Sequence, residues 1–245
     1  MIPFKDNNPT KTYPYATISI IALNGIAFIY ELALGDAVED LVLHYGVVPV
    51  KVIFFLSSPS LDPGAVIDTF LPFLTSMFLH GGPIHILGNM LYLWVFGDNI
   101  EDRLGHFKFV GFYLLCGITA SAVHVATNPT VGIPCVGASG AIAGVLGAYM
   151  IVFPGAKVLC LIPIGLFWPI VELPAVVVLG FWFVIQFFNG AAAFTSTTDA
   201  GGGVAWWAHI GGFVCGMVLI LLLSKIRFPA IKTRWHGETA SGGGV

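Results

Sequence analysis

Charged side chains are scarce in this sequence. Only 9% of its 245 residues are Asp, Glu, Lys or Arg, whereas 57% are hydrophobic, and the mean hydropathy is +0.90. An average soluble domain contains about 25% charged residues. This composition cannot cover a water-exposed surface and therefore excludes a soluble globular fold. We expect a multi-pass integral membrane protein in contact with a lipid bilayer.

Basic patches, metal-binding cysteine spacings and a signal peptide are also missing. The ten Lys and Arg residues are scattered or flank apolar stretches, which excludes a nucleic-acid partner. The four cysteines have no metal-binding or redox spacing. Three of them are expected to pack as small hydrophobic residues, whereas Cys135 has no assigned role. Residues 1–15 lack the continuous apolar core of a cleavable signal peptide.

What the chain does contain is a set of six long apolar stretches. They cover approximately residues 16–34, 84–101, 107–127, 137–153, 172–190 and 205–226. Each is close to the ~20 residues that cross a ~30 Å hydrocarbon core, and the fourth is short, which predicts a helix buried among the others. We predict an all-α, polytopic bundle of six transmembrane helices over residues 16–226. It lies between a cytoplasmic N-terminal segment (1–15) and a disordered cytoplasmic tail (227–245).

Two connections differ from ordinary loops. Residues 35–79 contain apolar pieces and several prolines, which predict short helices lying in the outer membrane interface. Residues 158–171 are also apolar, but Pro163 and Pro169 disfavour a continuous helix. We expect this second segment to be a loop or an interfacial lead-in to the fifth helix.

The distribution of Lys and Arg predicts the orientation in the membrane. With the N-terminus inside, the inner segments hold nine of the ten basic residues, and the outer segments hold only Lys51. Because positive residues are enriched on the cytoplasmic side, both termini are predicted to be cytoplasmic. Every even-numbered helix then runs from the outside to the inside.

Polar side chains inside the apolar stretches are costly and indicate function. The candidates are His85, Asn89, His124, Ser139 and His209. His85 and Asn89 begin the second helix and share one face. Ser139 begins the fourth helix, and His209 lies about one turn into the sixth. All but His124 are therefore expected at a similar shallow depth beneath the outer surface, and His124 is expected to form an interhelical hydrogen bond.

Small residues lie on the two helices that carry Ser139 and His209. Short runs of glycine permit close approach between helix backbones. The supporting positions are Gly137, Gly140, Gly212 and Gly216. We therefore expect the helices that carry Ser139 and His209 to touch, which would bring a hydroxyl and an imidazole within hydrogen-bond distance.

A serine beside a histidine permits acyl transfer. The Ser139 hydroxyl would be the nucleophile, and a neutral His209 would take its proton. The oxyanion formed in the attack needs preorganised donors, for which the candidates are the Ser139 backbone N–H, the Asn89 amide and His85. No Asp or Glu lies near His209 in its apolar stretch, so a dyad is favoured over a triad.

Three short motifs occur in a fixed order on alternate apolar stretches. They are "HILGN" (85–89), "GASG" (137–140) and "AHIGG" (208–212), and "GDNIEDRLG" (97–105) follows the first. This ordered set resembles the signature of the rhomboid intramembrane serine proteases, over about residues 16–226. The resemblance implies a nucleophilic Ser139, a general base His209 that later acts as the acid, and oxyanion stabilisation by His85 and Asn89.

The resemblance also implies features beyond the reacting groups. Glu101 and Arg103 match a structural motif at the inner end of the second helix. The site would open to the outer side, and the fifth helix and the loop at 191–204 would admit substrate. Substrates would be single-span membrane proteins cut near the outer end of the transmembrane segment, with no metal or organic cofactor. Similarity to compact bacterial members implies a bacterial inner membrane.

Two departures from the family pattern affect how the site is supported. Ala143 stands where some rhomboids carry an aromatic residue against the catalytic histidine. The Trp-Arg pair that some members carry in the first outer loop is absent from residues 35–79. Neither departure removes a reacting group.

Other functions fit parts of the pattern. Ser139 taken alone is more often a packing residue between membrane helices. A catalytically inactive rhomboid-like protein that binds membrane clients would be expected to lack the serine or the histidine. A transporter or a haem or metal protein could use the histidines, but no carboxylate cluster supports a metal, and Ser139 would go unexplained. The histidines in question are His80, His85, His124 and His209.

Overall fold

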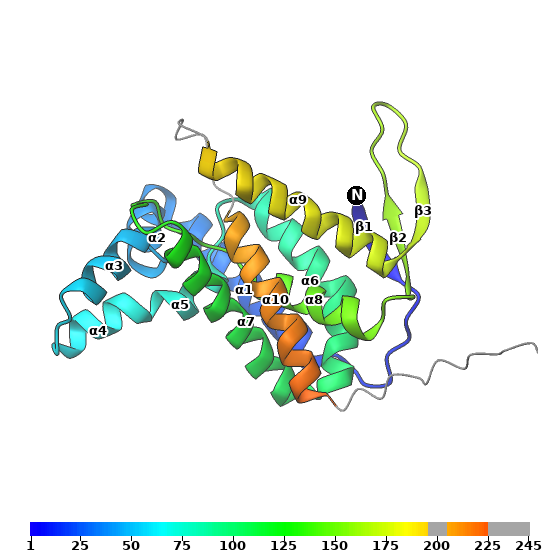
Figure 1. Cartoon of the computed structure of the whole chain (residues 1–245), viewed down its shortest axis with the longest axis horizontal. Helices are drawn as coiled ribbons and strands as arrows, with labels where there is room; N and C mark the ends of the chain where they lie inside the picture. Colours follow the sequence, from blue (N-terminus) through cyan, green and yellow to red (C-terminus); the bar gives the residue numbers. More distant parts are fainter. Residues whose placement is uncertain (196–204, 225–245) are drawn as a thin grey trace, which may run out of the picture.

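The computed structural model describes residues 1–195 and 205–224, which are mainly helical (Figure 1). The long helices are α1 (Tyr15–Leu34), α6 (Pro83–Leu104), α7 (His106–Thr127), α8 (Ser139–Val152), α9 (Ala175–Thr195) and α10 (Trp206–Leu223). Each overlaps one of the six predicted apolar stretches. The tail at 227–245 and residues 196–204 of the predicted access loop lie outside the described residues.

The described residues do not confirm the six membrane spans predicted. Four helical segments are long and apolar enough to cross a membrane, namely Tyr15–Tyr45, His106–Thr127, Ala175–Ala193 and Trp206–Leu223. The pair Pro63–Phe78 and Pro83–Leu104, bent by 77°, gives a fifth if it counts as one span. Helix α8 has 14 residues and is only about 21 Å long. The structure therefore supports a polytopic helical bundle with four or five candidate spans among the described residues.

The long connection after α1 consists of short helices, as predicted. They are η1 (Gly35–Ala37), α2 (Val38–Tyr45), α3 (Pro49–Ser57), α4 (Pro63–Phe70), α5 (Pro72–Thr75) and η2 (Ser76–Phe78). Proline occupies the first position of α3, α4 and α5, where its fixed φ suits a helix start. The Asp62 carboxylate accepts a hydrogen bond from the Ala65 N–H at 2.9 Å and caps α4. These helices gather at one end of the molecule (Figure 1).

A small β-sheet corrects the all-α prediction. Strands β1 (Ile2–Asp6), β2 (Lys157–Leu161) and β3 (Ile170–Pro174) form an antiparallel sheet in the order β1-β2-β3. Residues 158–171, predicted as a loop or lead-in, are therefore mostly a hairpin. Its two prolines lie outside the β2–β3 ladder, which pairs Leu161 with Ile170, so they remove no ladder hydrogen bond. The hairpin turn leaves Leu166 and Phe167 exposed.

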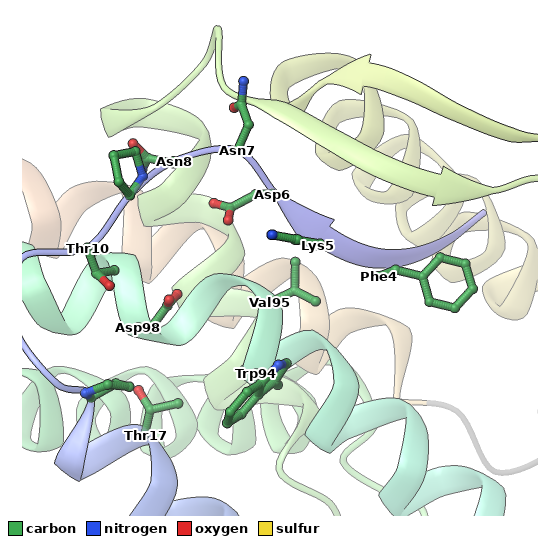
Figure 2. A pocket seen from close by; sticks show the side chains of 12 residues that line it. Phe4, Lys5, Asp6, Asn7, Asn8, Thr10, Thr17, Trp94, Val95 and Asp98 are labelled. Atoms are coloured by element: carbon green, nitrogen blue, oxygen red, sulfur yellow. The ribbon is translucent and has the colours of Figure 1, made fainter.

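The N-terminal segment also forms hydrogen bonds with α8 and α6, at the end of β1 and just after it. The Tyr149 hydroxyl of α8 donates to the Asp6 carboxylate, and the Asn8 amide donates to Asn99 of α6. A cavity of about 520 Å³ lies between this segment and α6, and Figure 2 shows Asp6 and Asp98 on its two sides. Burial raises the pKa of Asp6, an effect that its hydrogen bond with Tyr149 opposes.

Glu101 joins α6 to the start of α1. Its buried carboxylate accepts hydrogen bonds from the Ala16 N–H at 2.8 Å and the Thr17 N–H at 2.7 Å. The first N–H groups of a helix lack intrahelical acceptors and favour a negative charge. His106 Nδ1 lies 2.5 Å from the same carboxylate, a pairing that the sequence analysis did not predict. Arg103 lies in the last turn of α6.

Candidate active site

Helices α8 and α10 meet backbone to backbone. A Cβ built at Gly212 would lie 2.0 Å from the Gly140 carbonyl oxygen, and one at Gly216 would lie 1.9 Å from the Gly144 carbonyl oxygen. No side chain fits at such distances. Residues 140–149 of α8 are all buried, so the short helix is enclosed by its neighbours, as the sequence predicts. The glycines therefore fix how far apart these two helices lie.

This contact brings Ser139 and His209 together. Ser139 is the first residue of α8, and His209 lies in the first turn of α10. The Ser139 Oγ and His209 Nε2 atoms are 2.7 Å apart, which is a hydrogen bond. His209 is only 9% exposed, and Ser139 is partly buried. The sequence expectation that a hydroxyl and an imidazole meet at this end of the two helices agrees with this geometry.

The other ring nitrogen of His209 has a partner that the sequence reading missed. Gln186 Oε1 of α9 lies 2.7 Å from His209 Nδ1, and Gln186 is 6% exposed. A carbonyl oxygen can only accept, so Nδ1 carries the proton and Nε2 faces Ser139 as an acceptor. The expected pair is therefore a chain of three side chains. Gln186 is a polar residue inside an apolar stretch, and the rule that identified His85 and Ser139 would have found it.

Aromatic side chains support the His209 ring from α9 and α10. The ring of Trp182 lies 5.7 Å from it, tilted by 37°, and that of Trp206 lies 6.5 Å away at 88°. Ala143 of α8 is fully buried and cannot supply such a contact. The aromatic support therefore comes from a different helix than the family pattern led us to expect.

His85 and Asn89 lie beside the turn that precedes Ser139. A Cβ at Gly137 would be 2.9 Å from His85 Nε2 and 3.7 Å from Asn89 Nδ2, and Gly137 has a φ of +129°. Only glycine adopts this backbone without strain while leaving room for the two side chains. Asn89 Nδ2 is buried and has no hydrogen-bond partner in the described part of the chain. An amide donor is therefore available next to the serine.

A cavity of about 790 Å³ adjoins the proposed reacting groups. Ser139, His209, His85 and Asn89 line it together with Trp182. The loop before α6 contributes Gly81 and Gly82. The cavity is large enough for several residues of a peptide, and polar groups converge at one side of it.

His80 and His124 do not line this cavity, although the His80 ring lies 5.2 Å from the ring of His85. The His80 backbone N–H donates to both carboxylate oxygens of Glu31 at 3.1 Å. The His124 ring contacts Asn128, one turn away at the end of α7, at 3.4 Å. Among the described residues the His124 ring has no partner on another helix, so the predicted interhelical hydrogen bond is not found there. Within residues 1–195 and 205–224, no group of three or more His, Cys, Asp and Glu side chains could hold a metal ion.

Known proteins share much of this sequence. The Rhomboid domain family matches residues 68–226. The chain is 32% identical over 194 residues to the presenilin-associated rhomboid-like protein A, mitochondrial, of Danio rerio, covering 71% of this chain and 45% of that protein. It is 28% identical over 231 residues to the rhomboid protease GluP of Bacillus subtilis, covering 94% and 38% of the two chains.

A plant relative extends the comparison. The rhomboid-like protein 11, chloroplastic, of Arabidopsis thaliana is 30% identical over 164 residues, which cover 64% of this chain and 53% of that protein. The chain spans about half the length, or less, of these relatives. Their names refer to mitochondria, a chloroplast and a bacterium, so they give no support to a bacterial inner membrane in particular. The extent of the family match and these identities show that the chain belongs to the rhomboid family.

Proposed function

We propose that this chain is an intramembrane serine endopeptidase. It hydrolyses peptide bonds near the outer end of transmembrane segments in single-span membrane proteins. The observation that carries the proposal is the 2.7 Å hydrogen bond between Ser139 Oγ and His209 Nε2 at the wall of a 790 Å³ cavity. GluP, a relative over 94% of the chain, is named a protease.

In the first half of the proposed reaction, Ser139 Oγ attacks the carbonyl carbon of the substrate peptide bond. His209 Nε2 takes the hydroxyl proton as the oxygen–carbon bond forms. The protonated imidazole then gives this proton to the leaving amine as the carbon–nitrogen bond breaks. An acyl-enzyme on Ser139 remains. In the second half, water gives a proton to His209 as its oxygen attacks the ester carbon. The protonated His209 then returns this proton to Ser139 Oγ as the bond between Oγ and the acyl carbon breaks, which releases the acid and restores the Ser139 hydroxyl.

Charge develops on the substrate oxygen in both halves. In this proposal the Ser139 N–H at the start of α8 and the Asn89 amide donate to it. The support is that Asn89, His85 and Ser139 line the same cavity. Donors that are already oriented before charge develops stabilise the transition state strongly. The unpartnered Asn89 Nδ2 supports this role, because a buried donor without an acceptor costs free energy in the resting protein.

The charge pattern and the place of Ser139 on α8 support the proposed orientation and substrate class. The proposed compartment rests only on the resemblance to compact bacterial rhomboids. A multi-pass protein with both termini in the cytoplasm would hold the Ser139 end of α8 near the outer surface. A transmembrane substrate would then present its outer end to the cavity. We propose that the protein lies in a bacterial inner membrane. Its partners would be the lipid bilayer and membrane-spanning substrates.

Reconstitution into vesicles tests the proposal. A single-span reporter with small residues at its outer boundary is incubated with the parent chain, Ser139→Ala or His209→Ala. Matched controls are Ser19→Ala and His44→Ala, which remove an exposed hydroxyl and an exposed imidazole elsewhere. We expect cleavage by the parent and both controls, and a loss of at least about 10⁴-fold in the two site variants.

Other outcomes would contradict the proposal. Cleavage that persists in Ser139→Ala would show that another group or a contaminant cuts the reporter. A parent that never cleaves but retains the reporter through purification would identify a client-binding protein without catalysis. A haem absorption band or a stoichiometric metal in the purified parent would point to a different chemistry.

A further inference from the structure

The Gln186 side chain reaches His209 from a helix that is otherwise apolar at this depth. Its neighbours along α9 in "FWFVIQFFNG" are large and hydrophobic up to Asn189. Gln186 is 6% exposed, whereas Ile185 and Phe187 on either side are 38% and 45% exposed. An amide facing lipid or the core without a partner would cost free energy. Its 2.7 Å contact with His209 Nδ1 meets this requirement.

The direction of this hydrogen bond decides which tautomer His209 adopts. Neutral imidazole carries its proton on either nitrogen, and only the nitrogen without a proton can act as a base. Since Gln186 Oε1 accepts from Nδ1, the lone pair is on Nε2, which is the atom 2.7 Å from Ser139 Oγ. The opposite tautomer would place an N–H against the serine and leave Gln186 without a donor.

From this geometry we infer that Gln186 is a positioning residue for His209. It holds the Nδ1–H tautomer and aims Nε2 at Ser139, and it continues to accept from Nδ1 when the ring is protonated during the reaction. The inference rests on the proposed function, in which His209 is the general base. It adds a neutral third member to the pair, in the place where other serine hydrolases use a carboxylate.

The position of Gln186 on α9 has a second consequence. His209 is on α10 and Ser139 on α8, so their relative placement does not depend on α9. The orientation of the imidazole does depend on it, because the Gln186 carbonyl and the Trp182 ring both come from α9. Full basicity of Nε2 toward Ser139 therefore requires α9 to lie against α10.

Three variants separate positioning from packing. Gln186→Leu removes the acceptor and leaves a branched aliphatic side chain that ends one atom earlier, and Gln186→Glu keeps an acceptor oxygen. Asn189→Leu is the matched control, since it replaces an exposed amide by the same aliphatic group on the same helix. Thermal unfolding in detergent verifies that all three fold like the parent.

Two readouts are measured on each protein. One is kcat and KM for the single-span reporter. The other is the ¹⁵N spectrum of labelled histidine, in which protonated and unprotonated ring nitrogens are distinct and the His209 signals are those lost in His209→Ala. We expect Gln186→Leu to lose the pure Nδ1–H pattern and to lower kcat roughly tenfold with KM unchanged, as one lost hydrogen bond implies. Gln186→Glu and Asn189→Leu should keep both.

The two proposals fail in different ways. An Nδ1–H pattern that persists in Gln186→Leu, or a kcat equal to that of the parent, overturns the role of Gln186 while reporter cleavage continues. A fall in kcat that Gln186→Glu does not restore, with the tautomer unchanged, also overturns it and assigns Gln186 to packing. A parent that does not cleave overturns the proposed function, whereas the spectrum still tests whether Gln186 sets the tautomer.

Discussion

Helix α10 is packed differently on its two sides. Toward α8 the contact is between backbones, and a methyl group at Gly216 would lie 1.9 Å from a carbonyl oxygen. Toward α9 the contact is between aromatic side chains, with ring centroids of Phe183 and Phe213 4.7 Å apart and those of Trp182 and Phe213 6.0 Å apart. The first contact has no room to adjust, whereas side chains in the second can change rotamer.

This difference separates two parts of the site. The contact of α8 with α10 positions Ser139 and His209, and the contact of α9 with α10 positions the side chains around the His209 ring. The glycine contact sets the distance between Ser139 and His209. The aromatic contact brings Gln186 and Trp182 to the imidazole. Helix α9 also has an open outer face, where Val177 and Phe181 are about half exposed. The distance between the hydroxyl and the imidazole therefore depends on α8 and α10, whereas the surroundings of the imidazole ring depend on α9.

Among substitutions at the two helix contacts, the largest effect on stability and activity is expected from a methyl group placed between α8 and α10. In Gly216→Ala the new Cβ must displace the Gly144 carbonyl, and overpacking of this kind costs about 1–3 kcal/mol or more. The shift also moves His209 relative to Ser139, and misplacement by about 1 Å lowers activity roughly 10²-fold. Thermal unfolding in detergent and reporter cleavage measure the two effects.

The control for this substitution is a glycine on α9, the helix that packs on the other side of α10. Gly180→Ala places the same methyl group on α9, where nothing lies within 4 Å. Replacing glycine by alanine inside a helix is expected to stabilise it by about 0.5–1 kcal/mol. Equal losses in Gly216→Ala and Gly180→Ala would contradict the distinction between the two contacts.

A smaller effect is expected from the aromatic side. Trp182→Leu removes the ring beside His209 and part of the contact with Phe213, but leaves the glycine contact intact. An aromatic pair contributes about 0.5–1.5 kcal/mol beyond its buried area, so we expect a several-fold decrease in kcat and a folded protein. A loss as large as that of Ser139→Ala would mean that the α9 contact is as rigid as the α8 contact.

The smallest effect on stability is expected in the β-sheet, whose strand β3 leads into α9. Strand β3 runs directly into α9, and β1 joins this sheet through β2. Burial raises the pKa of Asp6 in β1, so the folded chain binds its proton more readily than the unfolded chain does. This contribution to stability is present at low pH and is lost as the pH rises through the folded pKa.

Asp6→Asn is therefore expected to stabilise the protein slightly at a pH above the folded pKa of Asp6, where the parent carries a partly buried charge. The difference should shrink as the pH falls toward the ordinary aspartate pKa of about 3.9. Thermal unfolding of the parent and Asp6→Asn across this range measures it. Destabilisation by Asp6→Asn above the folded pKa would show that the hydrogen bond with Tyr149 outweighs the burial of the charge.

Much of the helical architecture could be predicted because each helix needs only local information. A long apolar run predicts a membrane helix wherever it occurs, and the six long helices overlap the six runs. The sheet could not be predicted in this way. Strand β1 pairs Ile2 with Leu161, and nothing in either segment identifies a partner more than 150 positions away.

The same distinction applies to the candidate site. Its position at one end of the helices could be inferred from the places of Ser139, His209, His85 and Asn89 along their apolar stretches. The contact of Gln186 with His209 could not, because it depends on how α9 is rotated and how deep it lies against α10. The interhelical bond expected for His124 is not found among the described residues for this reason, since the ring contacts its own helix end instead.

The sequence by itself determined that this chain folds as apolar helices and that a serine and a histidine begin two of them. It did so because a chain with so little charge must bury its backbone polar groups in helices, and glycine runs allow two helices to touch. Only the tertiary structure decided which ring nitrogen of His209 faces the serine and which side chain holds the other. That choice depends on the rotation and depth of a third helix, which no local pattern encodes.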